Sequence, residues 1–270
     1  MRLVKLHKSL KYILPYKTKD LVRFGNKFDS GYVISKKALK NANFLLSFGM
    51  SNNWSFEENF LKFNLKNKIH IYDHTVGYKF FLINFVKSIK RLFYFKSNFE
   101  NISNKFKDLI GYYIIKNNNR VKHLQIKVSN KNLDKEENLK KIFSKIKDKK
   151  IILSIDIEGD EYKIMNEIVK YDKLIHLLII EFHFIDKKKT LFKKILINLK
   201  KKFDIIHIHG NNYTSYCKDG MPITLEITMR NRKIYPIKKK FYVKKFPNKN
   251  LDFPNFKDQK DLRFFFPKNL

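Results

Sequence analysis

Short apolar runs alternate with amphipathic segments along most of the chain. The central run, residues 151–156, is almost uninterrupted (IILSI) until it ends at Asp156. A continuous apolar run of this length predicts a strand that is buried on both faces, as in a parallel sheet. From Gly159 onward the spacing of apolar residues becomes helical, and acidic residues occupy the first turn, where they suit the helix dipole. This strand and helix predict the middle of an α/β sheet.

The same strand and helix patterns recur on both sides of this segment. Further strands are predicted at residues 43–48, 69–72, 121–128, 175–184, 203–209 and 223–229. Helices are predicted at 55–65, where Ser55 and Glu58 have capping-box spacing, and at 133–146 and 191–199, with one or two more within 76–116. Alternating strands and helices predict a doubly wound sheet, and the last two strands, with no helix between them, predict an antiparallel pair. The predicted class is α/β: a Rossmann-like doubly wound, seven-stranded, mostly parallel sheet with a C-terminal antiparallel edge hairpin.

Both ends of the chain lie outside this alternating pattern and are basic. Residues 1–40 predict a basic lead-in that covers one edge of the core, with a hairpin or a loop and strand around the turn signal Asp29-Ser30-Gly31. Residues 41–230 predict the Rossmann-like domain. Residues 231–270, with repeated Phe and Pro, predict a basic tail over the domain surface.

The formal net charge of +33 comes mostly from Lys. One interpretation is attraction to a polyanion such as nucleic acid, an anionic membrane or an acidic glycan. The other is compositional drift, in a chain rich in Lys, Asn, Ile and Phe. We favour drift, because the lysines are spread along the whole chain and Arg, which serves base and phosphate contacts, is scarce. Nucleic acid is therefore not the favoured partner.

Cysteine content and hydropathy indicate the compartment. The single cysteine, Cys217, excludes an internal disulfide framework and a multi-cysteine zinc site. The N-terminus lacks an uninterrupted apolar core of the signal-peptide type, and no stretch offers about 20 uncharged apolar residues. These features predict a soluble, cytoplasmic protein.

The segment at residues 78–95 is both aromatic and basic. It either packs as a helix on the sheet or lies at a membrane interface. We favour packing, since apolar helix faces usually pack on a core. Peripheral contact with an anionic membrane surface stays as the alternative.

Polar residues follow the first two predicted strands. The loop after the first strand contains Gly49, Ser51, Asn52 and Asn53. Backbone N–H groups at such a helix start can hold an anion, and glycine permits close approach, although an ordinary turn has the same pattern. Asp73 ends the second strand, where nucleotide-binding sheets place an acidic residue that bonds ribose hydroxyls. The alternative is that Asp73 caps a helix that begins near Thr75.

Carboxylates and imidazoles gather at the predicted carboxyl ends of three successive strands. They are Asp156, Glu158, Glu181, His183, His207 and His209. Buried at one rim, such groups are costly unless they are paired, ligated or used. A His beside a carboxylate can act as a general base on a hydroxyl, and the same set could hold a divalent metal. Acid–base chemistry and metal binding therefore both remain open at this rim.

Three segments carry a family resemblance: SIDIEGDEY at 154–162, LLIIEFH at 177–183 and HIHGNN at 207–212. They resemble the FkbM-type family of S-adenosylmethionine-dependent methyltransferases. The segments RFGNKFDSGYVI at 23–34 and LLSFGMSNNWSFEENF at 45–60 resemble the N-terminal part of a subgroup of that family. Together the resemblance covers roughly residues 20–230, which makes residues 41–230 the expected methyltransferase domain.

The resemblance implies O-methylation of a hydroxyl on a sugar, a glycan or a glycan precursor, with S-adenosylmethionine as cofactor. It implies that the Gly49 loop holds the methionine part of the cofactor, Asp73 the ribose and Ser129 the adenine. Asp156 and Glu158 would face cofactor and acceptor. Ser47 departs from the family, because an acidic residue is common at this position.

For the chemistry itself, His183 or His209 is the expected base, oriented by Glu181 or Asp156. Two other functions stay open. One is a metal-dependent enzyme that uses the same rim, and the other is a non-catalytic basic protein that binds a polyanion or a membrane surface.

Overall fold

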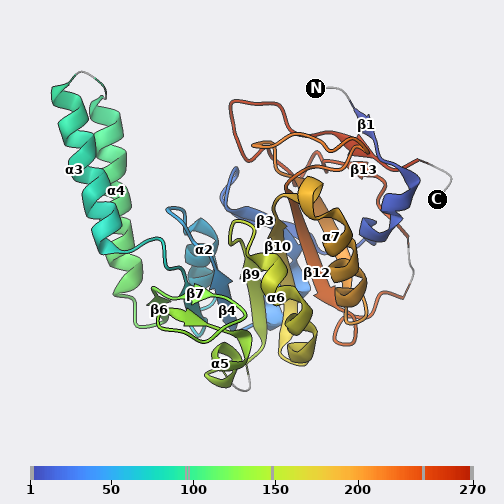
Figure 1. Ribbon diagram of the computed structural model, residues 1–270. Coiled ribbons are helices and arrows are strands. Elements are labelled where there is room, and N and C mark those ends of the chain that lie inside the picture. Colours follow the sequence, from blue (N-terminus) through green and yellow to red (C-terminus); the bar gives the residue numbers. More distant parts are fainter. Residues whose placement is uncertain (1–2, 95, 97, 147–148, 239–240, 268–270) are drawn as a thin grey trace.

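The computed structural model describes residues 3–94, 96, 98–146, 149–238 and 241–267. Seven strands form the main sheet in the order β11-β12-β10-β9-β4-β5-β6 (Figure 1). They are β4 (Phe44–Phe48), β5 (Lys68–Tyr72), β6 (Val121–Leu124), β9 (Ile151–Ile155), β10 (Ile175–Phe182), β11 (Phe203–Gly210) and β12 (Leu225–Asn231). Neighbours are parallel except β12, which is antiparallel to β10 and β11. The predicted Rossmann-like sheet with an antiparallel pair at one edge is confirmed.

The central strands bury side chains on both faces, which explains their continuous apolar sequence. Along β9, Leu153 and Ile155 belong to one core cluster, whereas Ile152 belongs to the other. The first cluster includes side chains of α5 (Leu139–Ser144), α6 (Glu161–Ile168) and α7 (Ile185–Leu199). The second includes α1 (Lys36–Asn41) and α2 (Ser55–Phe63). Helices therefore cover both faces of the sheet, as a doubly wound fold requires.

The two ends of the chain meet in a small second sheet. In it, β14 (Phe264–Phe265) pairs with β1 (Val4–Lys5) and with β13 (Lys245–Phe246). Near the N-terminus, η1 (Lys8–Ile13) is followed by the antiparallel hairpin of β2 (Leu21–Gly25) and β3 (Gly31–Ser35). The Thr228 hydroxyl of β12 donates to the backbone oxygen of Val33 at 2.7 Å, which ties this hairpin to the main sheet.

Several boundaries differ from the sequence expectation. The strand predicted over 121–128 leaves the main sheet after Leu124, and β7 (Lys127–Val128) pairs instead with β8 (Glu136–Glu137). The helix predicted from 133 begins only at Leu139, after Asn138 caps its first turn. The helix predicted at 191–199 begins at Ile185, and η2 (Val169–Tyr171) extends α6. The alternation of apolar and polar residues continues from β6 into β7. It therefore does not show that the chain leaves the main sheet after Leu124.

The capping box predicted at Ser55 does not form. Helix α2 has no side-chain cap, and the Ser55 hydroxyl donates to the backbone oxygen of Ser30 at 3.3 Å. The Ser55 hydroxyl therefore bonds to the N-terminal hairpin and is not used as a helix cap.

Helices α3 (Tyr78–Phe93) and α4 (Phe99–Lys116) form a hairpin that projects from the body (Figure 1). Its large buried side chains lie at its base, where Phe81 and Tyr112 stack and Trp54 packs on Phe81. The expectation that this region packs along the sheet is therefore wrong beyond the base. None of the helices in the described residues combines the length and apolar composition needed to cross a bilayer.

Candidate active site

The loop after β4 lies against the loop after β9, because these strands are parallel neighbours. Gly49 has a φ of +82°, and a Cβ there would lie 1.7 Å from the backbone oxygen of Asp156. An L side chain would meet both a backbone atom and an unfavourable φ, so only glycine fits. Gly49 therefore permits a close approach, as expected, and the group that approaches it is the backbone of Asp156.

Asp73, directly after β5, uses one carboxylate oxygen to hold the same loop and the other to hold Thr75. Oδ2 accepts hydrogen bonds from the N–H groups of Met50 and Ser51, each at 2.9 Å. Oδ1 accepts from the N–H and the hydroxyl of Thr75, at 2.8 and 2.6 Å. Burial alone would raise the pKa of Asp73, but these hydrogen bonds outweigh burial and lower it. The contact with Thr75 is local and caps no helix, because α3 begins at Tyr78 with Gly77 as its N-cap. Asp73 also borders a cavity.

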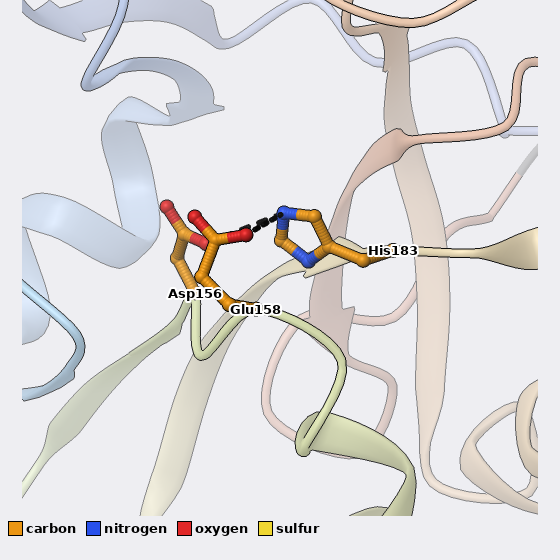
Figure 2. A group of neighbouring side chains, drawn as sticks. All are labelled: Asp156, Glu158 and His183. Atoms are coloured by element: carbon orange, nitrogen blue, oxygen red, sulfur yellow. Dashed lines mark ion pairs between the residues drawn. The ribbon is translucent and has the colours of Figure 1, made fainter.

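Three carboxylates surround one imidazole at the carboxyl ends of β9 and β10. Nε2 of His183 lies 3.5 Å from Oε2 of Glu158 and 3.7 Å from Oδ1 of Asp156. It also lies 3.8 Å from Oε1 of Glu181. Figure 2 shows Asp156 and Glu158 side by side, facing the His183 ring. The fold therefore brings together the four residues predicted on these two strands.

Glu161, the first residue of α6, orients the His183 ring from the other side. Its Oε1 lies 3.2 Å from Nδ1 of His183 and accepts the backbone N–H of the same residue at 2.7 Å. Its Oε2 accepts the N–H of Gly159 at 2.7 Å, and Glu161 is 0% exposed. With Nδ1 donating to Glu161, the Nε2 lone pair of a neutral His183 faces the carboxylates.

Burial and mutual repulsion favour the neutral forms of Asp156 and Glu181. Burial, and then the charge of Glu181, raises the pKa of Asp156 well above its usual range. Burial and Glu226 do the same for Glu181. Burial opposes a charged His183, but Glu161 and Asp156 outweigh it and raise the pKa of the imidazole. Such a rim favours a shared proton or a bound cation.

Two cavities meet at this rim and share Gly49, Ser51, Asp156 and Glu158. The larger, about 350 Å³, extends past Glu181 and His183 to Asn211 and the N-terminal hairpin. The smaller, about 160 Å³, extends to Asp73 and to the chain at residues 126–128. Molecules in the two cavities would meet beside Asp156 and Glu158.

The remaining loop and strand-end candidates lie at different distances from these cavities. Asn52 and Asn53 line the larger cavity, and the Asn53 amide donates to the backbone oxygen of Asp29 at 3.2 Å. Ser129 lines neither of the two, because its hydroxyl is bonded to the backbone of Lys131. The chain at 126–128, just before Ser129, lines the smaller cavity instead.

His209 and His207 also lie outside both cavities. His209 is buried between Glu226, at 3.3 Å from Nδ1, and Asp261, at 3.1 Å from Nε2. His207 pairs with Asp252 at 3.0 Å. Their partners Asp252 and Asp261 belong to the C-terminal segment, so these imidazoles join that segment to β11 and do not face the His183 cluster.

Two site residues were not singled out from the sequence, although helical spacing marks both. Glu161 lies four and seven residues before the buried Met165 and Ile168, so it shares their face. Glu57 lies three and four residues before the buried Phe60 and Leu61. It borders the larger cavity and accepts a hydrogen bond from Ser47 at 2.6 Å.

Glu57 also brings a carboxylate to the position where the family resemblance led us to expect one. Ser47, which stands at the position that is commonly acidic, is its hydrogen-bond partner. Burial raises the pKa of Glu57 to about 7. The acidic group beside the first loop is thus supplied by α2 and not by the end of β4.

Comparison with known proteins gives only weak likenesses. No family model matches the chain, and no curated protein matches it. Fibrillarin pre-rRNA processing protein from Methanococcus jannaschii is similar at a TM-score of 0.40 and 9% identity, over 72% of this chain and 68% of that one. Precorrin-6y C5,15-methyltransferase from Geobacter metallireducens has a TM-score of 0.36 and 9% identity, over 72% and 84%. Spermidine synthase from Thermotoga maritima has a TM-score of 0.39 and 13% identity, over 76% and 58%. Likenesses this weak do not decide what the chain does.

Proposed function

We propose that this protein is an S-adenosylmethionine-dependent O-methyltransferase. The observation that carries the proposal is the pair of cavities that meet at Asp156 and Glu158, at the carboxyl ends of parallel strands. Open α/β sheets bind ligands at this position. A transfer reaction needs two adjoining sites of this kind, one for the group donor and one for the acceptor. The segments that resemble FkbM-type methyltransferases supply most of the residues at the junction.

The smaller cavity suits the nucleoside part of the cofactor. Asp73 would hold the ribose, while the chain at 126–128 would contact the adenine. The loop at Gly49 and Ser51 leads from this cavity to the larger one and would hold the methionine part. When bound, the cofactor supplies an electrophilic methyl group on a sulfonium. That positive charge would offset the repulsion between Asp156 and its carboxylate neighbours.

The larger cavity would take the acceptor, a hydroxyl on a sugar, a glycan or a glycan precursor. That hydroxyl would accept the methyl group as the bond from methyl carbon to sulfur breaks, and its proton would pass to a base of this chain. His183 is that base, because Glu161 holds Nδ1 and leaves Nε2 facing the cavity. The rest of the rate enhancement comes from holding the two reactants in line.

Calorimetric titration with S-adenosylhomocysteine tests the proposal. Binding in the micromolar range that Asp73→Asn weakens at least about tenfold supports it, since a tenfold change is about 1.4 kcal/mol. Asp258→Asn, at an exposed position, is the matched control and should change nothing. A folded protein that does not bind this ligand contradicts the proposal and leaves a metal-dependent enzyme or a polyanion-binding protein.

A divalent cation is a second candidate cofactor at the rim. Ligand atoms of Asp156, Glu158 and His183 lie within 4.8 Å of one another, and Oδ1 of Asp156 has no hydrogen-bond partner among the described residues. Oxygen and imidazole ligands suit such an ion, so the residues fit it. The ion would supply charge that offsets the carboxylates and would orient a hydroxyl. Melting temperature measured with added Mg²⁺ or Mn²⁺, in wild type and in Asp156→Asn, tests for binding without any need for activity.

A further inference from the structure

The α3–α4 hairpin has an exposed apolar face that continues from one helix to the other. On α3 this face consists of residues spaced as one helical stripe, the exposed Tyr78, Leu82, Val86 and Phe93 and the half-buried Ile89. On α4 it consists of Phe99, Phe106, Ile110, Tyr113 and Ile114. Phe93 is 77% exposed and Phe99 is 79% exposed, although both are large apolar side chains. We call these ten residues the hairpin face.

A contact between the two helices places both stripes on one side of the hairpin. Phe85 and Phe106 pack with ring centroids 5.4 Å apart. Phe85 adjoins the α3 stripe, and Phe106 is part of the α4 stripe. Polar residues lie on another side, because Asn84 and Arg91 of α3 line a shallow cavity with Asn101 and Lys105 of α4. Around α3, Asn84 and Arg91 lie at least about 100° from Phe85.

The charges around the hairpin face are mostly positive. Residues 78–116 contain eight Lys and Arg against two acidic residues. Lys79 and Lys90 border the α3 stripe by their helical positions. A helix pair with an aromatic apolar face and basic edges suits the boundary between lipid headgroups and acyl chains. At 16 and 18 residues, the helices are about 24 and 27 Å long, enough to lie along a bilayer surface.

We infer that the hairpin face docks the protein on an anionic membrane surface. Charge complementarity favours this occupant over a second copy, because two chains of net charge +33 repel each other. The contact of Trp54 with Phe81, at 5.6 Å between ring centroids, anchors the hairpin to the body. A Cβ at Gly111 would lie 2.7 Å from the Trp54 ring, so the two fit closely. Docking of the hairpin therefore fixes the body near the lipid.

Vesicle co-sedimentation of the full chain tests this inference, without cofactor or acceptor, so the result does not depend on the proposed function. The vesicles are phosphatidylcholine alone, or phosphatidylcholine with about one-third phosphatidylglycerol. We expect sedimentation with the anionic vesicles, weaker binding as salt screens the charges, and little sedimentation with neutral ones. No sedimentation with anionic vesicles overturns the inference.

Matched triple variants separate the hairpin face from general charge. Leu82→Ser, Val86→Ser and Phe93→Ser combined should lower the partition coefficient at least about tenfold. The control combines Leu65→Ser, Leu133→Ser and Phe241→Ser, which are exposed apolar residues elsewhere, and should stay within about twofold of wild type. All six positions are exposed, so both variants should fold, as circular dichroism can verify.

Two further outcomes would also overturn the inference. Equal binding of the two triple variants means that charge alone attracts the chain to lipid. A wild-type dimer in sedimentation equilibrium that only the hairpin variant converts to monomer means that a second copy covers the hairpin face.

Discussion

At the carboxyl ends of β9 and β10, carboxylates surround one buried imidazole, whereas the α3–α4 hairpin exposes apolar side chains between lysines. The larger cavity is lined by Asp29, Glu57, Asp156, Glu158 and Glu181, and no Lys or Arg among the described residues lines it. This occurs in a chain of net charge +33. The comparison teaches that net charge describes the surface and not the site. A lysine among those carboxylates would pair with them and neutralise the rim.

The two regions also differ in what their charges do for folding. At the rim, Glu161 and Asp73 satisfy backbone N–H groups in buried positions, so each stabilises a loop. On the hairpin, ion pairs such as Lys105 with Asp108 are partly exposed and contribute little. Substitutions should therefore affect activity or stability strongly at the rim and weakly on the hairpin.

The largest effect is expected from His183→Ala. Loss of the base should lower kcat about 100- to 10,000-fold, because general-base catalysis contributes that much. Affinity for S-adenosylhomocysteine should stay within about twofold, since His183 faces the larger cavity. His7→Ala, an exposed histidine, is the control for both assays. An unchanged kcat would remove His183 from the role of base.

Gly49→Ala should destabilise the fold by about 3 kcal/mol or more. The added Cβ would meet the backbone oxygen of Asp156 at 1.7 Å, and φ is +82°. Urea denaturation measures the loss. Gly220→Ala, also at positive φ, should cost less, because a Cβ there would lie 2.8 Å from its nearest atom, the backbone oxygen of Lys5. Equal losses at the two sites would show that φ alone matters and not the approach to Asp156.

Asp73→Asn should cost about 1–3 kcal/mol at neutral pH, because the carboxylate accepts four hydrogen bonds. The pKa of Asp73 is lowered on folding, so its contribution is present above the unfolded pKa and is lost as the pH falls through the folded pKa. The difference in unfolding free energy between wild type and variant should therefore shrink in acid. If the difference stays constant as the pH falls through the folded pKa, the hydrogen bonds do not depend on the charge of the carboxylate.

Glu161→Gln should lower kcat about tenfold, because an amide orients the His183 ring less firmly than a carboxylate does. Glu161 is a positioning residue, so KM and cofactor affinity should move by less than about twofold. Steady-state kinetics separate the two quantities. A rise in KM with kcat unchanged would show that Glu161 shapes the cavity and not the base.

The smallest effect is expected from Asp108→Asn on the hairpin. Removal of its ion pair with Lys105, 3.0 Å long and partly exposed, should change the unfolding free energy by no more than about 0.5 kcal/mol. Urea denaturation measures this value as well. A loss as large as that of Asp73→Asn would break the contrast between rim and hairpin.

Local patterns determined most of the sheet. The continuous apolar runs at β4, β9, β10 and β11 predicted buried strands, since each strand contributes side chains to both core clusters. The antiparallel pair of β11 and β12 followed from the missing helix between them. The motif at residues 154–162 and the strand after it pointed to Asp156, Glu158, Glu181 and His183, because carboxyl ends of parallel neighbours meet at one rim.

Contacts between distant segments decided the rest. Partner choice for a polar side chain depends on what lies across from it, and sequence spacing does not contain that information. His209 pairs with Asp261 of the C-terminal segment, which is 52 residues away in the sequence, and therefore lies outside the cavities. The Ser55 hydroxyl donates to the backbone oxygen of Ser30, and the Ser129 hydroxyl donates to the backbone oxygen of Lys131.

By itself, then, the sequence determined the class of fold, the order of its strands along the chain and the rim that gathers its carboxylates, because these depend on local periodicity. Only the tertiary structure decided that Glu161 orients His183, that Asp73 holds the loop at Met50, and that the aromatic helices stand apart from the sheet. Apolar spacing marks a helix face as apolar, but it does not say whether a core, a lipid surface or solvent lies against that face.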